Sequence, residues 1–249
     1  MEREWIDLHA HILPGLDDGA QSMEDALEMA AMAAESGVHT IVATPHSHPQ
    51  GELPPRFASI VESRVRELQY RLRCEGIPLR LLPGMEIFAT PDTGWLLSRG
   101  ELLTLNGTRY ALVEFRFDED TMFMEEILQQ VTDRHLVPIV AHPERYFAVQ
   151  QHPQRVADWL RMGYGIQVNK GSLLGRFGSE AQDLAVELIR RRMATVIASD
   201  AHYPHMRTPE MASVAEALSH LVPPEEIRRL LTEFPRRLLN DELLKEADN

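Results

Sequence analysis

The sequence has little thiol and no excess of positive charge. Cys74 is the one cysteine among 249 residues, so no internal disulfide can form, which is typical of a reducing compartment. We expect Cys74, near the end of a predicted helix, to pack rather than to act in catalysis. Lysine and arginine number 25 against 38 aspartates and glutamates, giving a net charge of −13. Because contacts from Lys and Arg dominate binding to nucleic acid, this balance argues against a nucleic-acid partner.

Long apolar runs are also missing. No stretch of about 18 consecutive apolar residues occurs, and the N-terminal "MEREWIDLH" is charged and lacks the apolar core of a signal peptide. We therefore expect a cytoplasmic protein with no membrane insertion. The rest of the composition is ordinary for a globular protein, and 249 residues suit one large domain or two small ones.

Apolar strand-like runs alternate with amphipathic stretches. Strands are expected at 5–10, 39–45, 79–87, 109–115, 136–143, 164–169 and 194–202, and helices at 22–37, 57–76, 121–134, 154–162, 179–192, 209–221 and 224–247. Ser22 is a predicted N-cap and Gly37 a predicted helix end. The alternation predicts a parallel α/β architecture, and a barrel is favoured over an open sheet because of where the polar residues fall.

Histidine and carboxylate side chains recur at the carboxyl ends of the predicted strands. They are His9, His11, His46, Glu86, Glu114, His142, Asp200 and His202, and Asp17 and Asp18 follow shortly after His11 in "HILPGLDDG". In a (β/α) barrel these ends meet at one face. Residues i and i+2 of a strand point to the same side, so His9 and His11 can face one metal ion. Imidazole with carboxylate suits Zn²⁺, Mn²⁺ or Fe²⁺, and the number of candidates predicts two or three ions.

Clustered ions of this kind are the usual apparatus for phosphoester hydrolysis, since they bind phosphoryl oxygens and lower the pKa of a bridging water. Arg145 and Arg207 lie just after predicted ligands, and the planar guanidinium matches phosphate oxygens. Lys170 ends the strand that offers no ligand, and either reaches the site or is solvated. The stretch "GSLLGRFG" (171–178) is either a loop of close approach or an ordinary turn. No role is assigned to His48.

The motifs "DLHAH" with "PGLDDG", "ATPH", "PGMEI", "VEF", "AHPER" and "ASDAH", in this order, resemble the polymerase-and-histidinol-phosphatase (PHP) superfamily. They are most similar to its bacterial manganese-dependent protein-tyrosine phosphatase branch, found at capsule and exopolysaccharide loci. The similarity covers about residues 5 to 240. It implies one domain over 1–249, a distorted parallel (β/α)7-type barrel, and an active site at the carboxyl ends of the strands.

The resemblance also implies three metal ions and their ligands. His9, His11, Glu86 and Asp200 would hold the first ion, Glu86, Glu114 and His142 the second, and Asp18, His46 and His202 the third. Asp17 would be a neighbour rather than a ligand. Arg145 and Arg207 match the phosphate-binding and leaving-group-assisting arginines of the family.

The implied activity is metal-dependent hydrolysis of phosphotyrosine in proteins. The implied substrate is the tyrosine-rich tail of a bacterial tyrosine kinase that controls exopolysaccharide or capsule synthesis, and the implied cofactor is Mn²⁺, with Fe²⁺ or Zn²⁺ as alternatives. The sequence departs from the family pattern at Ser47, Met85, Arg116 and Tyr203, but no ligand is lost. Arg116 is a candidate for added positive charge at the rim of the site.

Three other interpretations compete. The first is a small-molecule phosphatase such as a histidinol-phosphate phosphatase, which shares the ligand set. The second is a non-catalytic metal-binding or proofreading-accessory module, and the third is a structural α/β domain with incidental histidines. The branch-specific "HILPGLDDG" argues against the first, the complete ligand set against the second, and the recurrence at six strand ends against the third.

Overall fold

Two parallel sheets form the centre of the computed structural model, which describes residues 4–48 and 50–244. The first has the strand order β1 (Trp5–Ala10), β2 (Val38–Ala43) and β3 (Arg80–Pro83). The second has the order β4 (Glu86–Phe88), β5 (Tyr110–Glu114), β6 (Val137–Ala141), β7 (Gly165–Asn169) and β8 (Val196–Ala198). All neighbouring strands pair in parallel, so the predicted α/β class with parallel strands is confirmed.

Two isolated parallel bridges join the sheets, one between β1 and the chain after β8 and one between the chain after β2 and β4. One bridge joins Ala10 to Ala201, and the other joins His46 to Glu86. Within the described ranges the strand ladders themselves remain two separate sheets, so the pairing establishes parallel α/β sheets but not a closed barrel.

The expected single strand over 79–87 is wrong, because it divides into β3 and β4. The break lies at Gly84, whose N–H donates to the carbonyl of Ala43, while the Glu86 N–H donates to the carbonyl of Pro45. A Cβ at Gly84 would lie 2.8 Å from Cγ1 of Val42, so the chain can pass this close to β2 only with glycine there. The chain thereby leaves β2 and delivers Glu86 to the edge of the second sheet.

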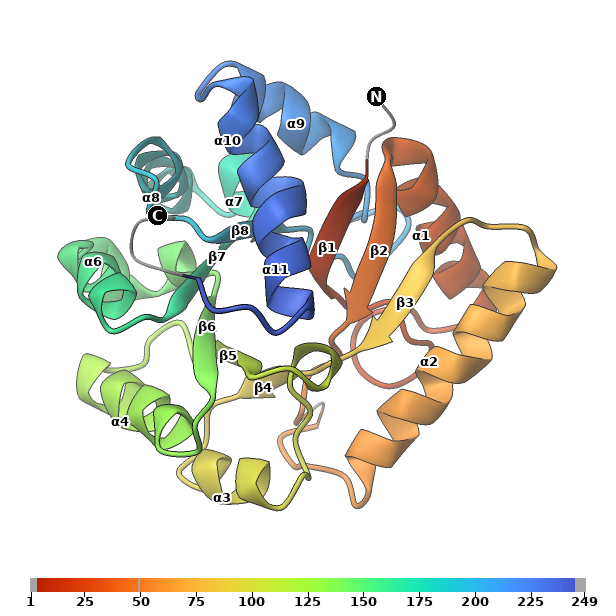
Figure 1. Cartoon of the computed structure of the whole chain (residues 1–249), viewed down its shortest axis with the longest axis horizontal. Helices are drawn as coiled ribbons and strands as arrows, with labels where there is room; N and C mark the ends of the chain where they lie inside the picture. The colour runs from red at the N-terminus through yellow and green to blue at the C-terminus, as the bar shows by residue number, and fades with distance from the viewer. Residues whose placement is uncertain (1–3, 49, 245–249) are drawn as a thin grey trace.

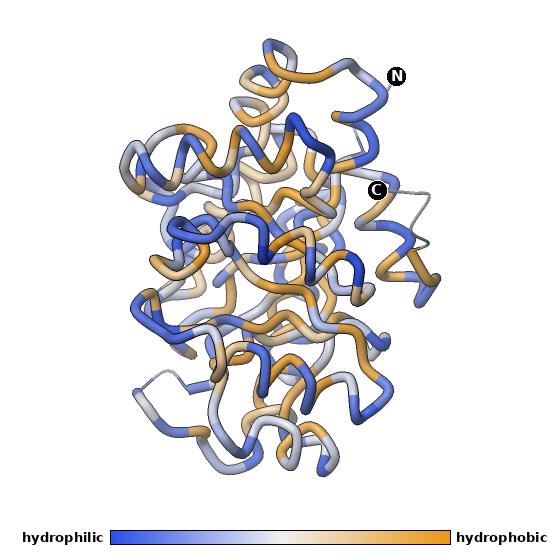
Figure 2. The backbone as a smooth tube through the Cα atoms, turned by 90° about the vertical axis from the view of Figure 1, so that its left-hand side faces the viewer, coloured by the Kyte–Doolittle hydropathy of each residue, from blue (hydrophilic) through white to orange (hydrophobic). Residues whose placement is uncertain are grey.

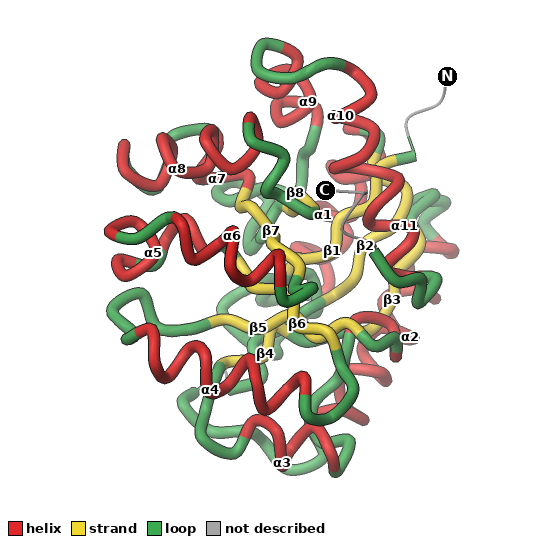
Figure 3. Tube along the Cα trace, turned by 60° about the vertical axis from the view of Figure 1, so that its left-hand side comes forward, coloured by secondary structure: helices red, strands yellow, loops and turns green. Residues whose placement is uncertain are grey.

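Helices surround the strands, as Figures 1 and 3 show. The predicted helices correspond to α1 (Met23–Ser36), α2 (Phe57–Cys74), α4 (Thr121–Thr132), α6 (Gln154–Arg161), α8 (Ser179–Arg190) and α9 (Ala212–Ser219). In α1 the Ser22 hydroxyl accepts a hydrogen bond from the Asp25 N–H, and Gly37 ends the helix, as predicted. Cys74, at the end of α2, is exposed, so its expected packing role is wrong. No helix within 4–48 or 50–244 is long and apolar enough to cross a membrane.

The C-terminal helical region is shorter and more broken than predicted. It consists of α10 (Pro224–Arg228), a π-helical turn over Arg229–Glu233, and α11 (Phe234–Leu239), and residues 245–247 of the prediction lie outside the described residues. Short helices α3 (Thr93–Ser98), α5 (Phe147–Gln151) and α7 (Lys170–Leu173), and 3₁₀ turns over Leu105–Gly107 and Pro143–Arg145, were not predicted. Elements of one or two turns show too little periodicity to be found from the sequence.

The amino ends of the strands are covered by α11, which crosses the centre of Figure 1. Arg236 donates to the Glu4 carboxylate just before β1, and the backbone N–H of Arg109, just before β5, donates to Asp241. Phe234 of α11 packs on an inner apolar cluster made by both sheets: Ile6, Leu8, Val42, Leu82, Leu112, Ile139 and Val196. A larger cluster joins the strands to the surrounding helices, and Figure 2 shows hydrophobic residues concentrated inside the molecule. Exposed ion pairs lie at the amino ends, whereas buried histidines and carboxylates gather at the carboxyl ends.

Candidate metal centre

The structure gathers all nine predicted ligands at the carboxyl ends of the strands. They are His9, His11, Asp18, His46, Glu86, Glu114, His142, Asp200 and His202. Most of them lie in a strand or directly after one, while Asp18 comes from the loop before α1. Parallel strands point the same way, and this orientation brings together residues separated by almost 200 positions in the chain.

The innermost group consists of His9, His11, Glu86 and Asp200, all buried. The two imidazole Nε2 atoms lie 3.2 Å apart, and Oε2 of Glu86 lies 3.2 Å from each of them. Oδ1 of Asp200 lies 3.5 Å from the His9 nitrogen and 3.4 Å from that of His11. Four potential metal-binding atoms therefore converge on one point, in the grouping that the family resemblance implied.

The other two groups overlap more than the sequence suggested. His46 lies 3.0 Å from Glu86 and 2.7 Å from Glu114, measured from its Nδ1, so it belongs with these carboxylates. His142, expected there, approaches Glu86 through its Nε2 at 2.9 Å. The imidazole of His46 also faces outward to the third group.

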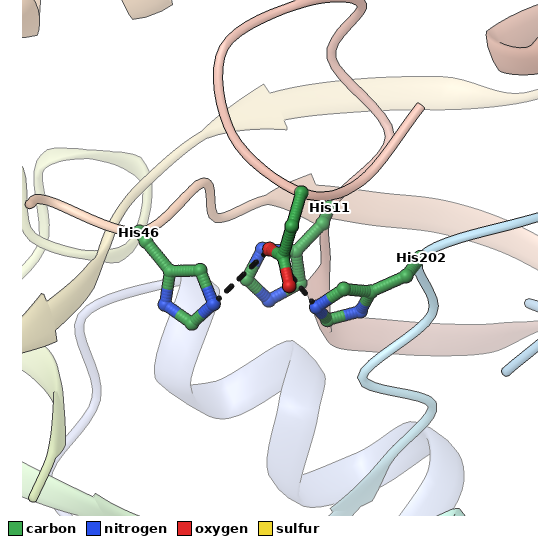
Figure 4. A group of neighbouring side chains, drawn as sticks. His11, His46 and His202 are labelled. Atoms are coloured by element: carbon green, nitrogen blue, oxygen red, sulfur yellow. Dashed lines mark ion pairs between the residues drawn. The ribbon is translucent and has the colours of Figure 1, made fainter. Parts of the chain in front are cut away.

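That third group contains His11, Asp18, His46 and His202. Oδ1 of Asp18 lies 3.4 Å from Nε2 of both His46 and His202, and these ion pairs are the dashed lines in Figure 4. The figure shows the imidazoles of His11, His46 and His202 turned toward the same place. The Asp18 side chain is 63% exposed, so this group lies at the open side of the centre.

Hydrogen bonds from behind hold the ligand-type side chains in place. Asp17 accepts from Nδ1 of His11 at 2.6 Å and from the backbone N–H of His46 at 3.0 Å. It is a neighbour rather than a member of any group, as expected. Oε1 of Gln167 lies 3.0 Å from Nδ1 of His9, and the Asn169 amide donates to Asp200. Such partners fix the orientation of a ligating ring or carboxylate.

Gln167 and Asn169 were missed by the sequence analysis, which treated their strand as offering nothing to the site. The available signal was two polar residues at alternating positions of the otherwise apolar β7, which point to the same side of the sheet. Asp7 was also missed, although its strand had supplied His9 as a predicted ligand. It lies two residues before His9, is fully buried, and accepts hydrogen bonds from the backbone of His9 and Ser199.

The ionisation of the carboxylates and imidazoles in the centre favours the binding of cations. Burial by itself would raise the pKa of Glu86 and Asp200, but facing groups, His9 foremost, hold both pKa values well below the ordinary range. Burial and the charge of Glu86 raise the pKa of Glu114 to about 7. Burial lowers the pKa of His202, which favours the neutral imidazole that coordinates metal.

The donor atoms fit a cluster of divalent cations. Oε2 of Glu86 and Nε2 of His202 are buried and have no hydrogen-bond partner among the described residues, although both face other ligand-type atoms. Buried polar atoms are normally paired, and unpaired atoms that converge on imidazoles and carboxylates are typical of a metal site. Nitrogen and oxygen donors without thiolate suit Mn²⁺, Fe²⁺ or Zn²⁺.

Strained backbone accompanies the centre. His142, Asp200 and Arg207 are non-glycine residues with φ values of 34°, 50° and 51°, in the left-handed region that L-residues rarely adopt. Strain of this kind persists where surrounding structure enforces it, and it is concentrated at functional sites. Here it directs the side chains that follow β6 and β8 inward.

Both predicted arginines reach the centre. Arg207 forms an ion pair with Oδ2 of Asp200, and Nη1 of Arg145 lies 3.6 Å from the same oxygen. The Arg145 guanidinium lies between two phenyl rings, 4.4 Å from the centroid of Phe117 and 4.0 Å from that of Phe177. This stacking holds the planar group with its N–H edge free to face the site.

Phe177 comes from the "GSLLGRFG" stretch, and its role was missed. A Cβ at Gly171 would lie 2.4 Å from Cε2 of Phe177, so glycine is required for the ring to approach. Residues 171–173 belong to α7 and residues 174–177 form turns, so each of the two expectations for this stretch holds in part: the chain turns here, and Gly171 allows the close approach of Phe177.

Lys170 neither reaches the site nor is solvated. It is buried, and its Nζ donates to the backbone carbonyls of Thr208 and Glu210. Burial lowers its pKa to about 8. Lys170 therefore fastens the loop that follows Arg207.

A cavity of about 480 Å³ opens over the centre. Its wall includes Asp18, Glu86, Glu114, His142 and both arginines, together with His48, Phe88, Phe115, Arg116 and Phe117. Arg116 is exposed and paired with Asp118 at 3.0 Å, so it lies at the rim as expected. Cys74 does not line the cavity.

Known proteins resemble this chain over most of its length. The family model "Capsular polysaccharide synthesis, CpsB/CapC" matches residues 5–240. The chain is 37% identical to the tyrosine-protein phosphatase YwqE of Bacillus subtilis, over 79% of this chain and 77% of YwqE. It is 29% identical to the tyrosine-protein phosphatase CpsB of Streptococcus pneumoniae, over 96% of this chain and 100% of CpsB.

Solved structures give the same picture. One of the crystal structures of YwqE and CpsB, described as metal-dependent tyrosine phosphatases, superposes with a TM-score of 0.89 at 32% identity, over 96% of each chain. A phosphotriesterase homology protein from Escherichia coli superposes with a TM-score of 0.60 at 9% identity, over 96% of this chain and 99% of that one. The second similarity concerns the fold alone.

Proposed function

The chain belongs to the capsular polysaccharide synthesis family CpsB/CapC, and from this premise we propose how its centre works. It is a metal-dependent protein-tyrosine phosphatase, as the resemblance of its motifs implied. The observation that carries the mechanism is that nine ligand-type side chains gather beneath a cavity of about 480 Å³ whose wall contains six of them together with Arg145 and Arg207.

We propose the following ligands for three metal ions. His9, His11, Glu86 and Asp200 hold the first ion, Glu86 and Glu114 with His142 hold the second, and Asp18, His46 and His202 hold the third. Because Nδ1 of His46 lies 2.7 Å from Glu114, His46 would hold the second ion as an alternative to the third. Mn²⁺ is the proposed metal, with Fe²⁺ and Zn²⁺ as alternatives. When bound, the ions supply positive charge to phosphoryl oxygens and lower the pKa of water.

The residues of the chain orient the substrate and neutralise its charge. Arg145, stacked between two phenyl rings, binds the phosphoryl oxygens, and Arg207 stabilises the departing phenolate. Water attacks phosphorus in line, the bond from phosphorus to the phenolic oxygen breaks, and tyrosine and phosphate are released. A phenolate leaves easily, so the site needs no strong general acid. No phosphoenzyme is required, and Cys74 lies outside the cavity wall.

The biological substrate is proposed to be the tyrosine-rich tail of a bacterial tyrosine kinase that controls capsule or exopolysaccharide synthesis, met in the cytoplasm. The name of the matching family, which refers to capsular polysaccharide synthesis, supports this proposal. The fold is proposed to be a distorted seven-stranded barrel in one domain over 1–249. The two isolated bridges between the sheets support this proposal, in which β3 and β4 count as one interrupted strand of seven.

The test is phosphate release from a Tyr-phosphorylated, Tyr-rich peptide by metal-stripped protein, with Mn²⁺, Zn²⁺, Fe²⁺ or Mg²⁺ added back singly. Histidinol phosphate is assayed alongside, and His220→Ala, an exposed histidine outside the centre, is the matched control for His9→Ala. Release from the peptide that is restored by metal and lost only in His9→Ala supports the proposal. Turnover of histidinol phosphate alone would make the protein a small-molecule phosphatase.

A further inference from the structure

A second hollow lies beside the reaction cavity, and we propose that it binds an apolar side chain next to the phosphotyrosine in the substrate polypeptide. The hollow measures about 210 Å³ and is lined by Phe117, Arg145, Phe147, Gln150, Phe177 and Ala181. We call it the phenylalanine hollow. The inference rests on the proposed function, because only a polypeptide substrate brings a neighbouring residue to this place.

The phenylalanine hollow adjoins the reaction cavity. Phe117 and Arg145 line both of them. The Arg145 guanidinium, stacked between Phe117 and Phe177, forms the partition between the two spaces. Consecutive Cα atoms lie about 3.8 Å apart, so a residue one or two positions from a bound phosphotyrosine falls within reach of the hollow.

The lining selects an apolar side chain. Three phenyl rings and the methyl group of Ala181 form most of the wall, and the Gln150 amide already donates to the carbonyl of Glu144. The one charged lining group is the guanidinium of Arg145, which disfavours a Lys or Arg side chain. Phenyl rings stack on this guanidinium and its Nη1 faces the reaction cavity, 3.6 Å from Oδ2 of Asp200, so an acidic side chain in the hollow would meet mainly phenyl rings.

The hollow is preformed and exposed. Phe147 is 55% exposed and Phe117 is 42% exposed, although large apolar residues are normally covered. The backbone N–H of Phe147 donates to the carbonyl of Phe117 at 3.0 Å, which holds the two segments together. Exposed apolar surface that borders a reaction site is typical of a place where a partner binds.

The experiment compares phosphopeptides that differ at one position, Leu against Ser, placed immediately before, immediately after or two residues after the phosphotyrosine. The metal-loaded enzyme is used, and kcat/KM is measured for each peptide and for free phosphotyrosine. We expect a preference of about 10-fold for Leu at one of these positions, which is the discrimination that a small apolar pocket provides. Phe147→Ser should bring this ratio close to one, whereas Phe147→Leu should retain most of it.

Trp95→Ser is the matched control, because Trp95 is an equally exposed aromatic residue, 54% exposed, that does not line the hollow. It should keep the wild-type ratio. If the Leu and Ser peptides are hydrolysed at equal rates at all three positions, the proposal that the hollow binds an apolar side chain is wrong. The proposed phosphatase activity would stand, because phosphate is released from each peptide. The proposal for the hollow would also be wrong if Phe147→Ser lowered kcat/KM equally for every substrate, free phosphotyrosine included. Failure to release phosphate from any substrate would reject the proposed function itself.

Discussion

The two ends of the same strands are built in opposite ways. At the amino ends, α11 covers an apolar cluster into which Phe234 packs, and exposed ion pairs surround it. At the carboxyl ends, imidazoles and carboxylates are buried together, and His142 and Asp200 adopt left-handed backbone. One end therefore provides stability without special chemistry, and the other holds buried charge that the rest of the fold must support.

The comparison shows that burial has different energetic consequences for neighbouring residues of one strand. Leu8 is buried because water leaves its apolar surface, which stabilises the fold. His9, the next residue, is equally buried, but burying its polar ring would be costly without the contacts that it makes with Gln167 and the facing carboxylates. Mutations at the two ends should therefore separate loss of activity from loss of stability.

The largest expected effect is at the carboxyl ends, in His9→Ala. This change removes a proposed ligand from the innermost group and leaves Glu86 and Asp200 with less positive charge. We expect kcat/KM to fall more than about 1,000-fold, or ~4 kcal/mol, together with the content of bound metal. Metal analysis and peptide kinetics check this. Full activity with undiminished metal would remove His9 from the centre.

The second effect belongs to the amino ends. Phe234→Ala should lower the free energy of unfolding by about 3–5 kcal/mol, since it leaves a cavity in the inner cluster. The folded fraction should keep its kcat, because Phe234 lies away from the cavity wall. Urea unfolding and kinetics at low temperature measure the two quantities. A fall in kcat as large as that of His9→Ala would show that the two ends are not separable.

Arg145→Lys should cost less than the loss of a ligand. Lysine keeps the charge but loses the planar group that stacks between Phe117 and Phe177 and presents two N–H groups to phosphate. We expect kcat/KM to fall about 100-fold, or ~3 kcal/mol, with metal content unchanged. Arg116→Lys, at the exposed rim, is the control and should change little. If Arg145→Lys and Arg116→Lys lowered kcat/KM equally, the stacked geometry of Arg145 would not be the cause of the loss.

The smallest effect is expected for Lys170→Met, which loosens the loop after Arg207. We expect a loss of about 10-fold in kcat, typical of a support behind a catalytic group. The unfolded chain keeps the Lys170 proton up to about pH 10.5, whereas the folded chain releases it near pH 8. As the pH rises through this interval, the free energy of unfolding of the wild type should therefore increase relative to that of Lys170→Met.

Urea titrations at pH 7.5, 9 and 10.5 measure that difference. Parallel pH curves for the wild type and Lys170→Met would show that the ammonium is not desolvated as its burial indicates. An unchanged kcat would show that Arg207 is held without this support.

Much of the fold follows from short-range patterns. The alternation of apolar strands and amphipathic helices indicated parallel α/β structure, and Ser22 and Gly37 marked the limits of α1. The division at Gly84 could not be predicted, because it depends on how closely the chain passes Val42 of a neighbouring strand. The local apolar pattern of 79–87 is the same for one strand or two.

The candidate site shows the same limit. The types and spacing of His9, His11 and Asp200 predicted a metal centre, because strand periodicity and the shared direction of parallel strands suffice to bring them together. Their role as ligands stays a prediction until metal is measured.

The sequence by itself determined the class of fold, the imidazole and carboxylate side chains of the centre and the end of the strands at which they meet. Only the tertiary structure decided that His46 approaches Glu114, that Phe177 stacks on Arg145, and that Lys170 turns away to the loop after Arg207. The physical reason is range. Periodicity and side-chain chemistry act over a few residues, whereas these contacts join residues far apart in the chain and depend on register, backbone strain and packing.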